Sequence, residues 1–381
     1  MSKVLKDLRP VYIIGVGQHP YQKPSTTPYT HLGVTAVRAA LRDSGLQWTN
    51  IESAYTGTAT TSMGLSRLMY RHLGATGIPM VQVENASASG SSAVRQACME
   101  VAAGLADVSI AVGVDKPLNF SMPQRVAGIE DLVGGKAVPF THFALLANRY
   151  MHDYGATPEQ FAQIAVKNSR NGALNPNAQR QKARSLEEVM AAPVISGALT
   201  SLQCCPIGEG AAAAIIVSDE AMQRHNLDKS RAVRVLSCVS RSETVYEREN
   251  FDAALTRETT EQALLEADLT ADELDVVELH DAFTVEEMLY VEAMGLCKEG
   301  EAAASLLAGD FDIGGRVAVS TSGGLLSSGH PIGPTGVGQI CEITIQLRGE
   351  AGKRQHPAAR AGLAHMVGVG AVCVVHTLIK E

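Results

Sequence analysis

The sequence lacks the features that mark membrane-spanning, secreted or nucleic-acid-binding proteins. No segment approaches the roughly 18 uninterrupted apolar residues that a membrane-spanning helix needs. The first ten residues carry charges where a signal peptide needs an apolar core. The net charge is −8, and no local cluster of Lys and Arg offsets it, which argues against general nucleic-acid binding.

Cysteine is present but is not arranged for metal binding or for a disulfide framework. The seven cysteines show no metal-type spacing beyond one adjacent pair: Cys98, Cys204, Cys205, Cys238, Cys297, Cys341 and Cys373. An odd number in a chain without a signal peptide indicates reduced thiols, so we expect a cytoplasmic protein without a metal. Aromatic residues are scarce, with a single Trp, but 45% of the residues are apolar. A chain of 381 residues with that composition can bury the cores of two or three domains.

The first half of the chain alternates short apolar runs with helical patterns, which indicates an α/β protein. Strands are expected at residues 11–16, 51–56, 81–84, 108–114 and 208–217, and helices at residues 32–44 and 91–105. Several of these strands are apolar throughout, which is typical of sheets that are covered on both faces.

The second half shows a similar order. Strands are expected at residues 233–239, 276–279, 317–320 and 367–378, and helices at residues 258–267 and 334–347. The helix-to-strand steps 32–55 and 259–279 have similar lengths and the same Ala- and Leu-rich pattern. This is a weak internal repeat, and any α/β protein can look self-similar by accident, so both interpretations stay open.

The stretch between the halves differs in composition. Residues 117–193 are richer in Asn, Gln, Arg, His and Met, with an isolated helical pattern at residues 158–169. We interpret it as an inserted cap over a site, where specificity usually resides. We therefore expect it to cover the pocket and to contact the substrate.

One segment, residues 322–333, places a histidine inside a glycine-dense turn directly before a helical pattern. Glycines allow positive φ and close approach to a ligand. His330 in such a turn is well placed for proton transfer or for donating to an oxyanion. A turn histidine can equally be structural, and the sequence alone leaves both roles open.

Five stretches together resemble the thiolases, most of all the sterol-carrier-protein-type thiolases and their bacterial relatives. They are residues 83–93 (Val-Glu-Asn-Ala-Ser-Ala-Ser-Gly-Ser-Ser-Ala), 208–213 (Gly-Glu-Gly-Ala-Ala-Ala), 280–283 (His-Asp-Ala-Phe), 323–333 (Gly-Gly-Leu-Leu-Ser-Ser-Gly-His-Pro-Ile-Gly) and, more loosely, 365–370 (His-Met-Val-Gly-Val-Gly). The resemblance extends over essentially the whole chain.

The resemblance implies a thiolase-like α/β fold, in which two similar βαβ halves form a five-layer α-β-α-β-α arrangement. The implied division is an N-terminal half at residues 1–116 plus 200–230, an inserted loop domain at residues 117–199, and a C-terminal half at residues 231–381. It also implies a homodimer or a dimer of dimers.

Two positions depart from the family pattern. Ser87 stands where thiolases present the cysteine that forms the acyl-enzyme. A helix N-terminus would favour a thiolate there, but a serine hydroxyl remains protonated at neutral pH and needs a strong base. The second cysteine, which acts as acid and base, is replaced by Met366 in the Cys-X-Gly pattern and by Ala282 in the His-Asp-X-Phe pattern. Cys373 fits neither position.

Other positions match the family. The resemblance implies that His330 activates the nucleophile and contacts the thioester oxygen, and that His280 helps to build the first oxyanion hole. The N–H of Ser87 and one from residues 366–370 would form the second. We therefore predict Ser87, His280 and His330 at one pocket, with Gly323, Gly324, Met366 and Gly368 as substrate or oxyanion residues. For His280, a structural role beside Asp281 is the alternative.

Three functions follow. The first is a thiolase-type acyltransferase that cleaves a 3-oxoacyl-CoA with CoA, or runs the reverse Claisen condensation, and that Ser87 impairs. The second is a retro-aldol lyase acting on a CoA-linked side chain, although such relatives commonly have tyrosine where His330 stands. The third is a CoA-ester-binding subunit that needs a partner, such as the small protein with zinc and OB domains that serves some bacterial relatives. Coenzyme A would be a substrate, not a cofactor, and the setting would be lipid or aromatic-acid degradation.

Overall fold

The structure, a computed structural model, describes residues 3–61, 63–117, 138–245, 251–368 and 372–381. Its main feature is a ten-stranded mixed sheet with the order β10-β9-β11-β12-β8-β1-β7-β4-β2-β3. The strands of the first half are β1 (Val11–Gln22), β2 (Ser53–Gly57), β3 (Met80–Val83), β4 (Val108–Asp115) and β7 (Glu209–Ser218). Those of the second half are β8 (Val233–Ser242), β9 (Val276–Glu278), β10 (Ala318–Val319), β11 (Ala361–Gly368) and β12 (Val372–Ile379).

The strand order shows that the internal repeat is real. Reading inward from each edge, the first half runs β3-β2-β4-β7-β1 and the second runs β10-β9-β11-β12-β8. In both halves the two outer pairings are parallel and the two inner pairings are antiparallel. The halves meet where β1 pairs with β8, antiparallel, over only three residues of each strand.

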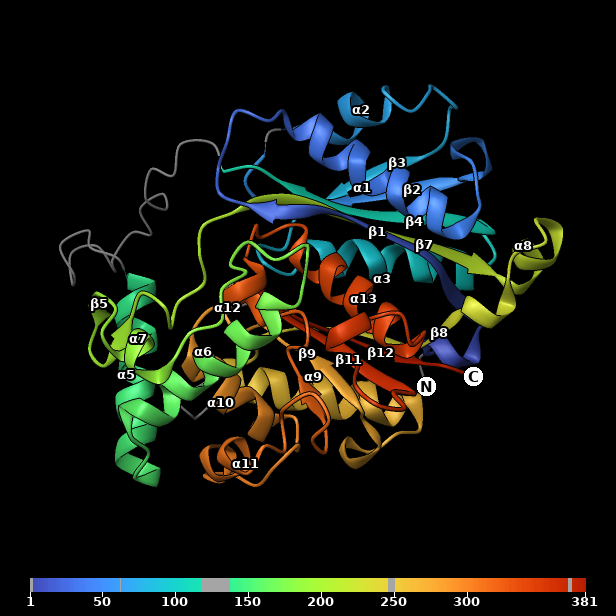
Figure 1. Cartoon of the computed structure of the whole chain (residues 1–381). Coiled ribbons are helices and arrows are strands. Elements are labelled where there is room, and N and C mark those ends of the chain that lie inside the picture. Colours follow the sequence, from blue (N-terminus) through green and yellow to red (C-terminus); the bar gives the residue numbers. More distant parts are fainter. Residues whose placement is uncertain (1–2, 62, 118–137, 246–250, 369–371) are drawn as a thin grey trace.

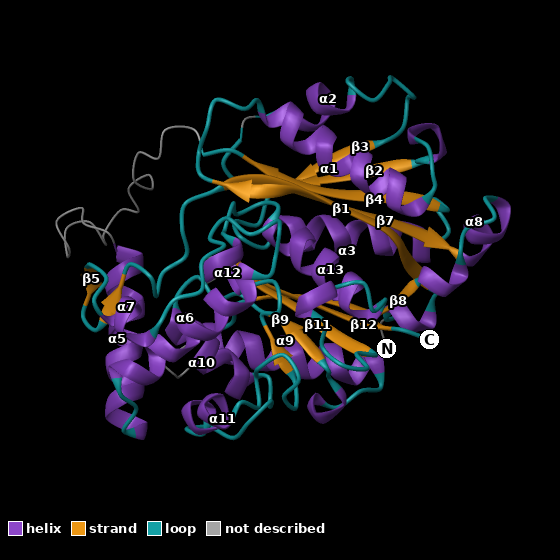
Figure 2. Cartoon of the chain, in the orientation of Figure 1, coloured by secondary structure: helices purple, strands orange, loops and turns teal. Residues whose placement is uncertain are grey.

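Helices lie on both sides of each half-sheet and between the halves (Figure 1). Those of the first half are α1 (Tyr29–Ser44), α2 (Leu65–Tyr70), α3 (Ser89–Ala102) and α8 (Asp219–Arg224). Those of the second are α9 (Phe251–Ala267), α10 (Thr284–Ala293), α11 (Ala302–Ala308), α12 (Gly324–Ser328) and α13 (Thr335–Leu347). Figure 2 shows α1 above the first half-sheet, α3 and α13 between the two, and α9 beneath the second. The five-layer α/β fold expected from the sequence is therefore confirmed.

Successive side chains along a strand lie on opposite faces of the sheet and pack in separate hydrophobic cores between the layers. Along β1, Val11 and Ile13 pack in the central layer with α3 and α13, whereas Tyr12 and Ile14 pack outward against α1. The central layer is thus buried from both sides, which explains why these strands are apolar on both faces. A third core packs α9 and α10 on the outer face of the second half-sheet.

One prediction about the elements is wrong. Residues 367–378 were expected to form a single final strand, but the structure has two antiparallel strands, β11 and β12, in register from Ala361↔Ile379 to Gly368↔Val372. The residues of β11 include Ala, Gly and His365, so that strand lacks the β-branched run that makes β12 visible in the sequence.

Between the halves lies an insert of α5 (Val138–Tyr154), α6 (Pro158–Ala173), α7 (Leu186–Met190) and the small hairpin of β5 (Val194–Ser196) and β6 (Leu199–Thr200). Helix α6 begins after Thr157, whose N–H donates to the Gln160 side chain at 2.9 Å, and Pro158 lies in the first turn. Among the residues that the structure describes, no helix could cross a membrane. Those residues also contain no cluster of three metal-ligating side chains.

Candidate active site

Ser87 lies in the turn that joins β3 to α3. The residue before it, Ala86, has a φ of +47°, in the left-handed region that non-glycine residues seldom adopt. The start of α3 fixes this turn: the Asn85 N–H donates to Ser89 Oγ (2.9 Å), and Ser89 Oγ donates to the Ala86 carbonyl (2.6 Å). Ser87 is only 6% exposed. A strained turn therefore holds the Ser87 hydroxyl in place just ahead of the helix.

His330 occupies the equivalent place in the second half, in the turn before α13. Its Nε2 lies 3.0 Å from Ser87 Oγ, at hydrogen-bond distance. Its Nδ1 is hydrogen-bonded to the hydroxyl of Thr335, in the first turn of α13, at 2.9 Å. Because α3 and α13 are repeats of one another, the fold brings together two side chains that are 243 positions apart in the chain.

Glycines allow the two turns to meet. A Cβ at Gly90, in the first turn of α3, would lie 2.3 Å from the Gly333 carbonyl oxygen, and a Cβ at Gly333 would lie 2.5 Å from an Asp115 carboxylate oxygen. That carboxylate accepts a hydrogen bond from the Gly333 N–H at 2.8 Å. Asp115 is the last residue of β4. The first half-sheet is therefore hydrogen-bonded directly to the turn that carries His330.

His280, which follows β9, completes the cluster. Its ring lies edge-on to that of His330, with centroids 5.3 Å apart. The Nδ1 atom is 3.0 Å from the carboxylate of Glu286, in the first turn of α10. The Nε2 atom is buried and has no hydrogen-bond partner among the described residues. The structure thus brings Ser87, His330 and His280 together, and it pairs His280 with Glu286 rather than with Asp281.

Burial decides the charge of His330. Removal from water, with a smaller effect from nearby His280, lowers the pKa of His330 well below 6.5. A neutral imidazole can accept the Ser87 proton, but the Thr335 hydroxyl carries no negative charge to stabilise the imidazolium that would result. This arrangement is therefore a weaker activator of serine than a carboxylate-backed histidine.

Neither Cys373 nor Cys205 stands at the position of a thiolase cysteine. Ala282 and Met366 are both buried. Cys373 lies in the outer core, and burial raises its pKa to about 12. Cys205 is nearer, since its N–H donates to the Ala282 carbonyl at 2.8 Å, but burial and the Glu286 carboxylate raise its pKa as well. Both thiols are protonated at neutral pH and are poor nucleophiles.

The glycines predicted to bind substrate have neighbours within the chain. A Cβ at Gly323 would lie 2.7 Å from Gly172 Cα of α6, and one at Gly324 would lie 2.1 Å from an oxygen of Asp281. The Asp281 carboxylate also accepts the Leu325 N–H at 2.6 Å. The structure therefore places Gly323 and Gly324 where they fix the turn, on the side occupied by α6 and Asp281.

The other predicted oxyanion residues lie at the end of β11. Met366 is fully buried beside Ala88 and Val374. Gly368 approaches the Ser87 turn, because a Cβ there would lie 2.3 Å from the Asn85 carbonyl oxygen. The rest of the predicted oxyanion loop, residues 369 and 370, lies outside the described residues.

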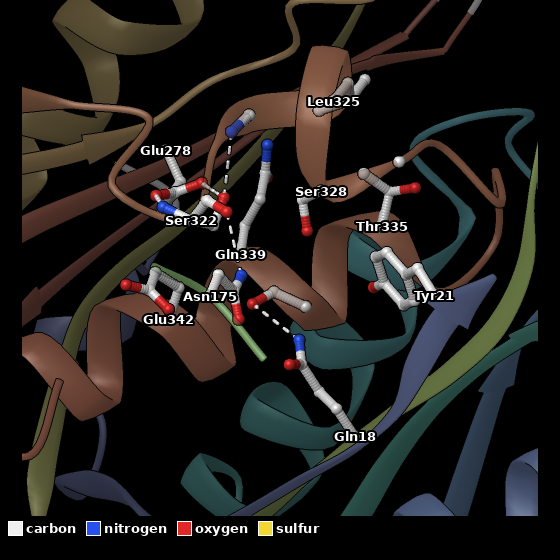
Figure 3. Close-up of a pocket in the computed structure, with 13 residues that line it drawn as sticks. Gln18, Tyr21, Asn175, Glu278, Ser322, Leu325, Ser328, Thr335, Gln339 and Glu342 are labelled. Carbon is white, nitrogen blue, oxygen red and sulfur yellow. Dashed lines mark hydrogen bonds between the residues drawn. The ribbon is translucent and has the colours of Figure 1, made fainter. Parts of the chain in front are cut away.

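A small polar cavity lies behind the His330 turn. Its volume is about 20 Å³, enough for roughly one water molecule. Figure 3 shows the polar groups that surround it, which include Thr335, Glu278 and Gln339. Burial and the neighbouring Glu342 raise the pKa of Glu278 to about 7, although hydrogen bonds from Ser322 oppose that rise. The cavity is too small for a substrate.

The described part of the insert packs against the turns of this cluster. Phe143 of α5 stacks on Phe283, with ring centroids 4.2 Å apart. The amide of Asn168, in α6, donates to Asp281 at 2.8 Å. The Arg180 guanidinium donates to the Leu326 carbonyl at 2.9 Å. The insert therefore supports the segments that carry His280 and His330, while residues 118–137 of the predicted cap lie outside the described residues.

Sequence reasoning missed two residues of this cluster, Thr335 and Glu286. Thr335 lies five residues after His330 and is the first residue of α13, directly after the turn already singled out. Glu286 stands beside Glu287 in a pattern that resembles a solvated helix face, yet both side chains are buried. The signal for Glu286 was its place six residues after His280, in a helix that starts directly after the His-Asp-Ala-Phe turn.

Comparisons with known proteins cover both halves. Residues 11–220 match the family model described as "Thiolase, N-terminal domain", and residues 238–380 match "Thiolase C-terminal domain-like". Bovine (Bos taurus) sterol carrier protein 2 is 36% identical over 97% of this chain and 72% of its own length. The benzoylsuccinyl-CoA thiolase subunit BbsB of Thauera aromatica is 36% identical over 95% of both chains.

Solved structures have the same fold. One described as "Ltp2-ChsH2(DUF35) aldolase" superposes with a TM-score of 0.82 and 26% identity, over the full length of both chains. Human mitochondrial 3-ketoacyl-CoA thiolase superposes with a TM-score of 0.75 over the full length of both chains, at 17% identity.

Proposed function

Because this chain belongs to the thiolase family, we propose that it makes or breaks a carbon–carbon bond in an acyl group carried by coenzyme A. The observation that carries the proposal is the 3.0 Å hydrogen bond between Ser87 and His330, where the two halves meet. Acyl-CoA and CoA are then substrates, and the chemistry needs no metal.

The first form of this activity is acyl transfer. Ser87 Oγ would attack the C3 carbonyl of a 3-oxoacyl-CoA while His330 takes the hydroxyl proton. The C2–C3 bond would then break, its electron pair would stay on C2 and take a proton, and acetyl-CoA would leave. The acyl group on Ser87 would pass to the thiol of CoA. We propose that this route is slow, because an alkoxide is far less available than a thiolate and His330 has no carboxylate behind it.

The second form is retro-aldol cleavage of a 3-hydroxyacyl-CoA, which needs no nucleophile. A base would take the proton of the 3-hydroxyl, the C2–C3 bond would break to give a carbonyl compound, and C2 would take a proton. Two observations favour it: neither cysteine of the thiolase pattern is present, and a relative whose structure is described as an aldolase has the same fold.

A CoA-ester-binding subunit is the non-enzymatic alternative. BbsB is described as a thiolase subunit, and the aldolase structure is described with a second component, ChsH2(DUF35). We propose that this chain forms a homodimer or a dimer of dimers in the cytoplasm and can require a small partner protein.

The test compares this protein with its Ser87→Cys variant on a panel of 3-oxoacyl-CoA esters with added CoA. We expect slow thiolysis that the cysteine increases by roughly 10³-fold or more, with an acyl-enzyme detectable by mass spectrometry. Equal rates would instead make Ser87 a competent nucleophile.

The same proteins are also assayed on 3-hydroxyacyl-CoA esters without CoA. Cleavage there, retained in Ser87→Cys, would favour the aldolase form. If both proteins bind CoA esters in calorimetry and neither turns over any of them, the result would favour the CoA-ester-binding subunit.

A further inference from the structure

The Glu286 side chain has no part in the activity as proposed so far, yet it is held firmly beside the site. Three donors converge on its carboxylate: His280 Nδ1 at 3.0 Å, the Tyr290 hydroxyl at 3.2 Å and the Phe283 N–H at 2.9 Å. Glu286 is only 2% exposed. A buried carboxylate surrounded by donors on both oxygens is a fixed acceptor.

This fixed acceptor sets the tautomer of His280. A carboxylate on Nδ1 places the ring proton on that atom and leaves the lone pair on Nε2. The Nε2 atom is buried and has no partner in the described part of the chain. The neighbouring ring of His330, with its centroid 5.3 Å from that of His280, is already bonded at both nitrogens, to Ser87 and to Thr335. A buried nitrogen lone pair without a donor is unfavourable unless a ligand supplies one.

We propose that His280 is the base of this site and that Glu286 positions it, so that the pair takes the place of the missing acid/base cysteine. The inference rests on the proposed function, since it assigns a proton acceptor to the same CoA-ester site. His280 Nε2 takes a proton from C2 of the CoA ester, and the C–H electron pair moves to form the enolate, with its charge on the thioester oxygen. The imidazolium that results is stabilised by the Glu286 carboxylate and returns its proton to C2 in the reverse step.

The proposal changes the role that the family resemblance implies for His280. In the neutral tautomer set by Glu286, Nε2 accepts a proton, whereas an oxyanion hole needs a donor. Only after proton transfer does Nε2 carry a proton that it can donate. His280 then helps the Claisen direction by forming the enolate, and the retro-aldol direction by accepting the hydroxyl proton.

The experiment measures exchange of the C2 protons of acetyl-CoA in D₂O by NMR, with the full-length protein. This exchange needs only a base and a bound CoA ester, so it does not require Ser87 or carbon–carbon chemistry. We expect exchange with the wild-type protein. Glu286→Gln should lower the exchange rate by about 10²- to 10⁴-fold, because the amide can donate to Nδ1 and so place the ring proton on Nε2. His280→Gln should do the same, and calorimetry should find the affinity for acetyl-CoA retained in both.

The matched control is Glu287→Gln, the same change one residue along α10. Glu287 faces Lys167, 3.0 Å away, instead of His280. This variant should lose stability, because a buried ion pair is broken, but it should keep the exchange rate of the protein that remains folded. Tyr290→Phe, which removes one of the other donors to Glu286, provides a second control whose expected loss is less than about 10-fold.

Two outcomes would overturn the inference. One is loss of exchange in His330→Gln while Glu286→Gln and His280→Gln exchange normally, because His330 would then be the base. The other is binding of acetyl-CoA by the wild-type protein without any exchange. Failure of the proposed function would give another result. The wild-type protein would still exchange the C2 protons, Glu286→Gln would still slow that exchange, and no 3-oxoacyl- or 3-hydroxyacyl-CoA would be cleaved.

Discussion

At the scale of single residues, the Thr335 hydroxyl fixes the ring of His330 and so aims Nε2 at Ser87. Thr335→Val removes that bond with little change in shape, and we expect the rate of CoA-ester cleavage to fall about 10- to 100-fold, a part of what general base catalysis contributes. Steady-state kinetics on the best substrate of the panel would measure it, with the fall expected in kcat rather than in KM.

Thr344→Val offers a matched control on the same helix. Thr344 is also buried in α13, but its hydroxyl has no hydrogen-bond partner among the described residues. This variant should keep full activity and should be no less stable. Equal kcat values for the two variants would mean that Thr335 does not orient His330.

At the scale of elements, the active site depends on how closely α3 approaches the turn before α13. Gly90→Ala places a methyl group 2.3 Å from the Gly333 carbonyl oxygen, and because that atom belongs to the backbone, the two elements must move apart. We expect a loss of about 1–3 kcal/mol in the free energy of unfolding, together with loss of activity, since the Ser87–His330 distance must change. Urea unfolding and the cleavage assay measure the two effects. Gln96→Ala, on the exposed side of α3, should change neither.

The helices and strands also show which parts of the fold and of the site could be predicted from the sequence. The apolar runs of β4, β7 and β12 predicted strands covered on both faces, and the resemblance to the thiolases implied the five layers and the meeting of Ser87, His280 and His330. Strand β11 was missed because small residues and a histidine interrupt its apolar sequence. Its pairing with β9 and β12 defines it as a strand, and that pairing cannot be seen in its own side chains. Glu286 was missed because a Glu-Glu pair looks solvated until the packing of α10 is known.

At the scale of the whole molecule, stability must depend on the buried histidines. His376, in β12, is fully buried, and neither ring nitrogen has a partner in the described part of the chain. Burial, with a smaller effect from Arg95, lowers the pKa of His376 from 6.5 to about 3. Between about pH 3 and pH 6.5, His376 binds a proton in the unfolded chain but not in the folded chain. The contribution of His376 to stability is therefore complete above pH 6.5 and is lost progressively as the pH falls toward 3.

Other groups act in the opposite direction, so the effect of His376 has to be isolated by comparing variants. The pKa of Glu278 is raised to about 7, which stabilises the folded state at low pH and is lost as the pH rises through 7. His376→Leu leaves Glu278 unchanged and removes only the histidine. The decrease in the free energy of unfolding between pH 7.5 and pH 4.5 should be smaller in this variant than in the wild-type protein by roughly 2–3 kcal/mol, which is two pKa units of linkage.

A second variant separates the effect of protonation from that of polarity. His376→Gln cannot titrate, so it should show the same weakened pH dependence as His376→Leu. At pH 7.5 it should be less stable than His376→Leu, because an amide without partners would be buried where leucine packs. Urea midpoints at the two pH values measure both differences. If both variants lose stability on acidification as steeply as the wild-type protein does, His376 is not protonated on unfolding, and the acid sensitivity of this fold must arise at His365 or His330, whose pKa values burial also lowers.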